Sequence, residues 1–284
     1  MSLDTRTQWG IIKAVNFSAR LSQLCCSSVF LVPFLAAGLT VTAGAQTWPP
    51  AVSVPDAPHP QEQVTLRAIP LNILKDEGAI WSSPARIRDH NFGYLIPLGL
   101  AVAGAITTDH QAMADVVSHD ANFNNANTNA SNVLVGPFIA APAVMFAAGH
   151  FMGSDHARES GILGGEAILD GLVVEQGMKL IFWRERPTVD SAKGKFFQTS
   201  VGWDSSFPSS HSVIAWSSAA VLAEEYPSRL NRLGIYTLAT GVSLTRVLGQ
   251  QHFPSDVLAG SAFGWMIGHY VYKKHHRWHE PISR

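Results

Sequence analysis

The sequence has little cysteine and little charge, and each shortage excludes a class of protein. Both of its 2 cysteines, Cys25 and Cys26, lie near the N-terminus. Disulfide-stapled folds, thiol catalysis and cysteine-ligated metals are therefore not expected in the rest of the chain. Charged residues make up 14% of the 284 residues, and the formal net charge is -1. Binding to a phosphate backbone needs a clear basic excess, so no nucleic-acid partner is expected.

The sequence also lacks the alternation of apolar and polar residues that is typical of β-strands, and it has no internal repeat. Its apolar residues, 46% of the total, recur mostly at helical spacing. We therefore expect an all-α bundle of roughly six main helices, with the active site built from helix ends and loops. The expected helices cover 94–106, 134–148, 160–183, 212–224, 233–248 and 257–272, after a short amphipathic helix within 71–88 that Pro84 breaks.

The N-terminal segment resembles an export signal. Three basic residues precede an apolar run at 29–41, and small residues at 43–45 follow it. This order predicts a signal peptide over residues 1–45, with an uncleaved membrane anchor as the alternative. Residues 46–66 are rich in proline and read as a linker, which leaves 67–284 as the helical domain. We expect an exported, periplasmic protein, with contact to the membrane left open.

Two segments before residue 160 lead to specific expectations. The apolar run 94–106 is short for a membrane span, which favours a buried core helix. The interval 122–132 is crowded with asparagine, which favours turns over helix interiors, so a loop is expected there. Pro137 and Pro142 follow, and regular helix is expected to begin near Pro142.

The first of three clusters that carry chemistry lies at the end of the helix expected over 160–183. Lys179 precedes Arg186 by seven residues, about two helical turns, so both cations could face one anion. Pro187 biases Arg186 away from helical geometry, which predicts that the helix ends there. A basic helix end that complements the helix dipole is the alternative.

The second cluster is Pro208-Ser209-Ser210-His211, immediately before an apolar helix. Serines in this place are helix N-cap candidates, which is the structural alternative. A helix N-terminus also presents free N–H groups and partial positive charge to phosphate oxygens. His211 in the first turn would lie beside that anion as a proton donor.

The third cluster contains Arg246, His252 and Asp256, with Pro254 marking a new helix start. His252 could donate Nδ1–H to the Asp256 carboxylate, which would leave Nε2 free as a nucleophile. A purely structural hydrogen bond between the two residues is the alternative.

In their order and spacing, the three clusters resemble the signature motifs of the type 2 phosphatidate phosphatase superfamily. That superfamily also includes bacterial acid phosphatases and vanadium haloperoxidases, and the resemblance covers residues 160–272. Two positions depart from its usual pattern. Ser210 stands where glycine is common, and Thr245 stands where a serine often precedes the arginine. Neither change removes a charged or nucleophilic group.

The resemblance implies how phosphate would be bound. Three cations would hold the phosphoryl oxygens and offset charge in the transition state: Lys179, Arg186 and Arg246. Ser209 and the amide of Ser210 would add hydrogen bonds. No metal or other cofactor is expected for the reaction, because the cations supply the electrostatics, and vanadate is expected to occupy the same site as a phosphate mimic.

The resemblance also implies the catalytic roles. His252 would attack phosphorus and form a phosphohistidine, with Asp256 orienting the ring. His211 would protonate the leaving group and then activate water. The expected function is therefore a phosphohydrolase acting on a soluble phosphomonoester or on a lipid phosphate or pyrophosphate.

Two other functions compete with this one. A vanadium-dependent haloperoxidase would use the same pocket, since a shared fold does not determine function. A non-catalytic protein that binds phosphate or lipid would need only the cations.

Other charged residues have simpler explanations. Glu166 and Asp170 are expected to hold their helix through ion pairs, although they could instead steer the basic side chains. The basic and histidine-rich tail at 273–279 is expected to be solvated or to contact anionic lipid, rather than to bind metal.

Overall fold

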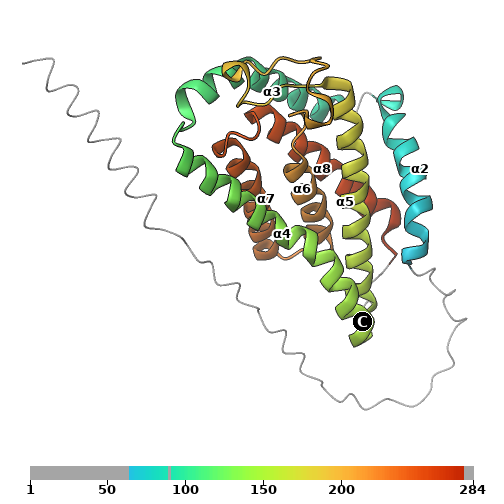
Figure 1. The fold of residues 1–284 in the computed structure, drawn as a ribbon. Coiled ribbons are helices and arrows are strands. Elements are labelled where there is room, and N and C mark those ends of the chain that lie inside the picture. Colours follow the sequence, from blue (N-terminus) through green and yellow to red (C-terminus); the bar gives the residue numbers. More distant parts are fainter. Residues whose placement is uncertain (1–63, 89–90, 278–284) are drawn as a thin grey trace, which may run out of the picture. The chain divides into compact units, whose positions relative to one another are not determined.

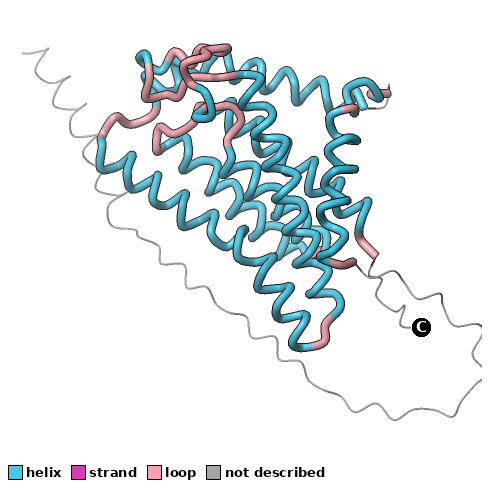
Figure 2. The backbone as a smooth tube through the Cα atoms, turned by 45° about the vertical axis from the view of Figure 1, so that its right-hand side comes forward, coloured by secondary structure: helices cyan, strands magenta, loops and turns pink. Residues whose placement is uncertain are grey.

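The computed structural model describes residues 64–88 and 91–277, all of which belong to the unit Pro58–Arg284. The predicted signal peptide and nearly all of the predicted linker lie outside the described residues. Within the described ranges the chain consists of helices and loops without a strand (Figures 1 and 2), so the all-α prediction is confirmed.

Seven α-helices make up most of the described part of the chain. They are α2 (Ile69–Trp81), α3 (Phe92–Gln111), α4 (Ala121–Met152), α5 (Asp155–Phe182), α6 (Ser210–Glu225), α7 (Arg229–Leu248) and α8 (Pro254–His275). The π-helix Ala112–Val116 extends α3. Short 3-10 helices lie at Leu66–Ala68, Ser83–Arg86, Asp190–Ala192 and Gly202–Asp204. Each bundle helix from α5 to α8 overlaps its predicted range almost completely.

Local sequence explains where these helices begin. The side chains of Asp120, Ser154 and Ser228 accept hydrogen bonds from backbone N–H groups in the first turns of α4, α5 and α7. These caps satisfy donors that have no partner inside the helix. Pro254 occupies the first position of α8, as predicted, where its missing N–H costs nothing.

Helix α6 lies at the centre of the bundle and packs against α4, α5, α7 and α8. Three glycines spaced by four residues on α8 permit a close approach to α6. A Cβ on Gly260 would lie 2.8 Å from Ser209 O, one on Gly264 would lie 2.6 Å from Val213 O, and one on Gly268 would clash with Ser217 O. The close contact brings the start of α6 beside the start of α8, where the Ser209 amide donates to Asp256 O at 3.1 Å.

The asparagine-rich interval 122–132 is helical, so the predicted loop is wrong. The Asp120 cap starts α4 there, and its polar face contacts other parts of the bundle. Thr128 donates to Gly249 O at 3.4 Å, and Ser131 accepts from Arg246 at 3.1 Å. These tertiary contacts outweigh the low helix propensity of asparagine, which is a weak local preference.

Helix α4 also continues through Pro137 and Pro142, so the predicted helix start near Pro142 is wrong. A proline has no N–H to bond the carbonyl four residues earlier, which for Pro142 is that of Phe138. The buried Ser218 hydroxyl on α6 donates to Phe138 O at 3.0 Å. A neighbouring helix thus supplies the hydrogen bond that the proline removes.

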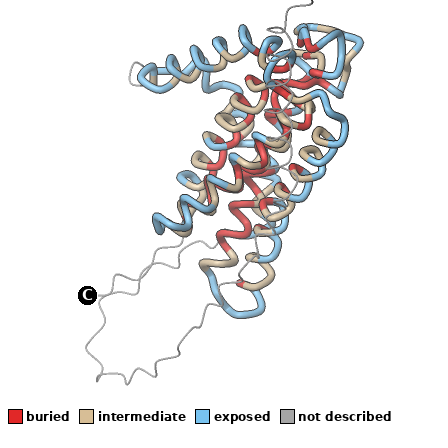
Figure 3. Tube along the Cα trace, turned by 90° about the vertical axis from the view of Figure 1, so that its left-hand side faces the viewer, coloured by how far each residue is buried: buried red, intermediate tan, exposed pale blue. Residues whose placement is uncertain are grey.

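Helix α3 is not the buried core helix that was predicted from 94–106. In α3 itself, Asp109 is the one buried residue. Figure 3 shows the buried residues concentrated along the inner helices, whereas α3 is mostly exposed or intermediate. Two segments, Phe92–Val116 and Ala121–Met152, are long and apolar enough to cross a membrane, and their apolar windows are 6% and 22% buried.

Candidate active site

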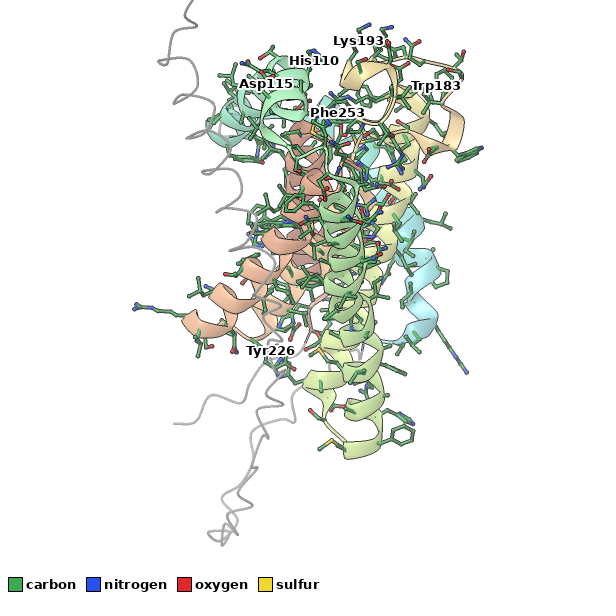
Figure 4. All side chains as sticks on the ribbon, turned by 60° about the vertical axis from the view of Figure 1, so that its left-hand side comes forward. His110, Asp115, Trp183, Lys193, Tyr226 and Phe253 are labelled. Carbon is green, nitrogen blue, oxygen red and sulfur yellow. The ribbon has the colours of Figure 1, made fainter. Side chains whose placement is uncertain are left out.

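The three motif clusters meet at one end of the bundle, where α5 and α7 end and where α6 and α8 begin. Figure 4 shows Trp183, which follows α5, and Phe253, which precedes α8, at this end. Tyr226, which follows α6, lies at the opposite end. Residues far apart in the sequence are therefore brought together around the N-terminus of α6.

Arg186 does not continue α5, contrary to the prediction that the helix ends at Arg186. The helix ends at Phe182, because Trp183 takes a left-handed conformation with φ of 37°. Arg186 lies in the following loop, where its guanidinium donates to Asp204 Oδ1 at 2.8 and 3.0 Å. It also donates to Gln251 O at 3.0 Å, immediately before His252. The loop, and not a shared helix face, therefore places this cation in the site.

Lys179 is held by a carboxylate that the sequence analysis did not assign to the site. Its Nζ lies 2.8 Å from Glu175 Oε1, one turn earlier on α5, and 3.1 Å from Ser210 Oγ. Ser210 donates in turn to Glu175 Oε1 at 2.5 Å. Glu175 and Lys179 are both buried. The side chain of Ser210 therefore helps to position the Lys179 ammonium, in addition to the backbone role expected for this residue.

Two buried donors in the site lack partners among the described residues. These are the hydroxyl of Ser209, the residue preceding the first turn of α6, and Nε of Arg246 in the last turn of α7. Burial, and then the nearby charge of Arg186, lower the pKa of Arg246 to about 10. Unpaired buried donors are costly in native proteins. A bound oxyanion would satisfy both groups.

His252 has one ring nitrogen bound and the other available. Its Nδ1 lies 2.8 Å from Ser206 O, and a carbonyl can only accept, so Nδ1 carries the proton. Nε2 is then the nitrogen with a free electron pair. Asp256 Oδ2 lies 3.7 Å from Nδ1, beyond hydrogen-bond distance. The predicted direct His252–Asp256 hydrogen bond is therefore replaced by one to a backbone carbonyl.

Asp256 acts on His252 through Ser206 and is itself fixed by a buried arginine. Its Oδ2 accepts from Ser206 Oγ at 2.5 Å and from the Phe253 amide at 2.8 Å. Its Oδ1 accepts from Arg184 Nη1 at 2.6 Å. Arg184 is 1% exposed and also pairs with Asp109 of α3 at 2.7 Å. A continuous buried chain thus runs from Asp109 on α3 through Arg184 and Asp256 to Ser206, beside His252.

Arg184 is further enclosed by aromatic rings. Its guanidinium lies 4.2 Å from the ring centroid of Phe253 and 4.5 Å from that of Phe196. A cation over the face of an aromatic ring is attracted to it electrostatically, and the attraction is stronger where water is excluded. The arginine is therefore held on its faces by rings and at its edges by two carboxylates.

Both histidines are held in the neutral form. Burial, and then the positive charges of Arg246 and the other cations, lower the pKa of His211 to about 4. Burial also lowers the pKa of His252 to about 4, although Asp256 opposes the shift. His252 can therefore act as a neutral nucleophile at pH 7. His211, whose Nε2 donates to Asn132 Oδ1 at 3.0 Å, needs a nearby anion before it can hold a second proton.

Anion binding is accordingly expected to raise the pKa of His211 from about 4 toward neutrality, because the anion offsets the cations that lower it. Histidine-selective NMR titration with and without vanadate measures this shift. A matched Arg246→Met variant should show a raised pKa of His211 without vanadate, although burial keeps it below 6.5. An unchanged His211 titration in saturating vanadate would contradict the expected coupling.

Several site residues were missed from sequence. Glu175 precedes Lys179 by four residues, a spacing that favours ion pairs on helices and could have revealed it. Arg184 lies between Lys179 and Arg186, but nothing local distinguishes it from a surface cation. Asp109 and Asn132 come from distant helices and had no sequence signal.

The site chemistry fits an oxyanion better than a metal ion. Three cations and two neutral histidines converge there, and the carboxylates Glu175 and Asp256 are already paired with Lys179 and Arg184. Vanadate, a tetrahedral phosphate mimic, fits the same donors. If it were bound, it would supply the oxidation chemistry of a haloperoxidase.

Comparisons with known proteins found similarities to phosphatases. The family model described as the PAP2 superfamily matches residues 160–280. A lipid A 1-phosphatase of Porphyromonas gingivalis is 31% identical over 110 residues, which are 38% of this chain and 22% of that protein. The chain thus matches about a fifth of the length of this curated relative.

A solved structure, described as that of the first transmembrane PAP2 type phosphatidylglycerolphosphate phosphatase from Bacillus subtilis, also aligns. It has 19% identity and a TM-score of 0.43, and the alignment covers 75% of this chain and 100% of that one. Three ordered motifs meet in one buried site, and the family model spans the segment that carries them. The chain is thus similar to the PAP2 superfamily over residues 160–280.

Proposed function

We propose that this protein is a metal-independent phosphohydrolase that removes phosphate from a lipid phosphate or pyrophosphate at a membrane. The observation that carries the proposal is the combination of two unpaired buried donors, Ser209 Oγ and Arg246 Nε, with a neutral histidine whose Nε2 is free. The named relative, a lipid A 1-phosphatase, supports a phosphorylated lipid as the substrate.

In the first step, His252 Nε2 attacks phosphorus in line with the leaving oxygen. The new N–P bond forms as the P–O bond to the lipid breaks, and His211 gives its proton to the departing oxygen. Cations around the phosphoryl group offset the charge that develops on its oxygens. The carboxylate of Asp256, 3.7 Å from Nδ1, stabilises the positive charge on the phosphorylated ring.

In the second step, His211 takes a proton from water, which attacks phosphorus and breaks the N–P bond. Inorganic phosphate leaves and His252 returns to its neutral state. No metal takes part in either step of this proposal.

The exposed helices support a membrane location. Large apolar side chains cover α3 and α4, including Leu100 at 68%, Val133 at 73% and Phe151 at 85% exposure. Apolar patches of this kind mark surfaces that contact lipid or another protein. We propose that these helices contact lipid, and that residues 1–45 direct the chain out of the cytoplasm.

The function is tested with full-length protein extracted from the membrane fraction. Its mass reports whether residues 1–45 have been removed. Phosphate release is then measured from phosphatidate, an isoprenyl pyrophosphate and a soluble aryl phosphate, each with and without EDTA. We expect the protein to be in the membrane fraction. We also expect phosphate release from a lipid to be about 10-fold or more faster than from the aryl phosphate, and EDTA to leave both rates unchanged. A chain in the soluble fraction that prefers aryl phosphate would reject the lipid proposal.

A haloperoxidase would use the same donors, so the same preparation is assayed for bromide oxidation with vanadate and hydrogen peroxide. Bromide oxidation without any phosphate release would favour that function instead. The expected result is inhibition of phosphate release by vanadate and no bromide oxidation.

A further inference from the structure

A second buried cluster lies between α2, α5 and α8, outside the phosphate site. Its side chains are Asp76 on α2, Glu166 and Asp170 on α5, and Lys274 and His275 at the end of α8. Glu166 lies 13 residues before Lys179, about 20 Å along the helix. The cluster therefore has no direct contact with the reacting phosphate.

Two carboxylates in the cluster are buried with few hydrogen-bond partners. Glu166 and Asp170 are each 0% exposed, and among the described residues Asp170 has no hydrogen-bond partner, whereas Asn72 lies close enough to Glu166 to oppose the rise of its pKa on burial. The expectation that both act through ion pairs holds only for Glu166, whose Oε1 lies 3.4 Å from His275 Nε2. Buried charges without partners cost several kcal/mol. Both oxygens of Asp170 and Oε2 of Glu166 therefore require a positive partner or protons.

Three atoms that can coordinate a metal ion already lie close together. His275 Nε2 lies 2.7 Å from Asp76 Oδ2 and 3.4 Å from Glu166 Oε1, and all three atoms lie within 4.8 Å of one another. Ligands around a cation at about 2.1 Å lie about 3.0 to 3.4 Å apart. The two distances from His275 thus need shifts of about 0.3 Å or less, and the distance between the two carboxylate oxygens is at most 4.8 Å. The tail histidine, expected to be solvated, instead lies against buried carboxylates.

Asp170 lies next to this group on α5. It follows Glu166 by four residues, which places both side chains on the same face of α5. Lys274 binds the other oxygen of Asp76, Oδ1, and leaves Oδ2 to His275. The Lys274 side chain is 37% exposed, so its ammonium can turn to solvent without being left buried.

We propose that Asp76, Glu166 and His275 form a structural site for one divalent transition-metal ion, Zn²⁺ or Mn²⁺, with the carboxylate of Asp170 beside them on α5. Two carboxylates with one imidazole suit these ions better than Mg²⁺ or Ca²⁺, which prefer oxygen ligands alone. The ion would link α2 and the end of α8 to the middle of α5. It would stabilise the fold and take no part in phosphate transfer.

The alternative to a metal ion is that protons neutralise the buried carboxylates. Burial, and then the neighbouring carboxylates, raise the pKa of Asp170 to about 8, so a proton can neutralise this group near pH 7. A metal ion and protons predict different responses to added metal. A proton-filled cluster gains no stability from Zn²⁺ or Mn²⁺.

The test uses the full chain in detergent, stripped with EDTA and then titrated with Zn²⁺, Mn²⁺, Mg²⁺ or Ca²⁺. Metal content and Tm are measured for the natural protein, for the double variant E166Q/D170N and for D155N. Asp155 is a matched control, because it is a carboxylate on α5 whose side chain is 59% exposed. If the double variant does not fold, H275Q replaces it.

We expect about one Zn²⁺ or Mn²⁺ per chain and a rise in Tm of about 5 to 10 °C at 100 times Kd. The rise should be retained in D155N and lost in E166Q/D170N or H275Q. No rise with either ion overturns the proposal in favour of protons. A rise that survives in the cluster variants, or that Mg²⁺ and Ca²⁺ alone produce, also overturns it.

Discussion

Replacement of His252 by alanine is expected to lower kcat for phosphate release by about 10⁴-fold or more, because the variant has no nucleophile to form the covalent intermediate. His252 is 2% exposed, and its Nδ1 is occupied by Ser206 O, so its Nε2 is the attacking atom. The remaining cations still bind phosphate. KM and vanadate affinity should therefore change by less than about 10-fold.

The measurement combines steady-state kinetics with trapping of the phosphorylated enzyme. Natural protein quenched during turnover of a ³²P-labelled lipid should carry an acid-labile, base-stable label, as expected for phosphohistidine. H252A should carry none. His269→Ala is the matched control, because His269 lies on α8 and stacks on Trp265 at 5.2 Å. Substantial turnover by folded H252A would eliminate the nucleophile assignment.

The second large effect is expected from Arg184→Met. The substitution keeps much of the side-chain volume but leaves the carboxylates of Asp109 and Asp256 buried without their shared cation. Loss of one partner from a buried ion pair typically costs about 3 to 5 kcal/mol of folding free energy. Urea unfolding at pH 7 measures this loss. Arg184→Lys should recover part of it, since one ammonium cannot match the forked contacts of the guanidinium.

Arg184→Met should also change catalysis in a way that a purely structural role would not. Without Arg184, the charge of Asp256 is no longer offset, and it raises the pKa of His252 more strongly than in the natural protein. The acid limb of the kcat/KM profile should therefore move to higher pH. kcat should fall by about 10 to 100-fold, since Asp256, which accepts from Ser206 Oγ, loses the ion pair that fixes it. An unchanged pH profile with reduced stability would assign Arg184 a structural role alone.

Much of the helical content could be predicted because it depends on local patterns. Apolar spacing over 160–272 predicted α5 to α8, and Pro254 marked the start of α8. The prediction of a loop over the Asn-rich segment was wrong, because the helix there depends on contacts made by Thr128 and Ser131 with α7 and the turn after it. The prediction that the helix over 94–106 is buried was wrong, because composition alone does not show what packs on an apolar helix.

The sequence by itself determined which motif side chains the site contains, and their order along the chain. Lys179, His211, His252 and the two motif arginines meet as that order implied. Only the tertiary structure decided what holds them: Glu175 for Lys179, Ser206 O for His252, and Arg184 with Asp109 for Asp256. The physical reason is that a motif specifies reactive groups over short spacings. Their orientation and pKa depend on burial and on partners from helices far away in sequence.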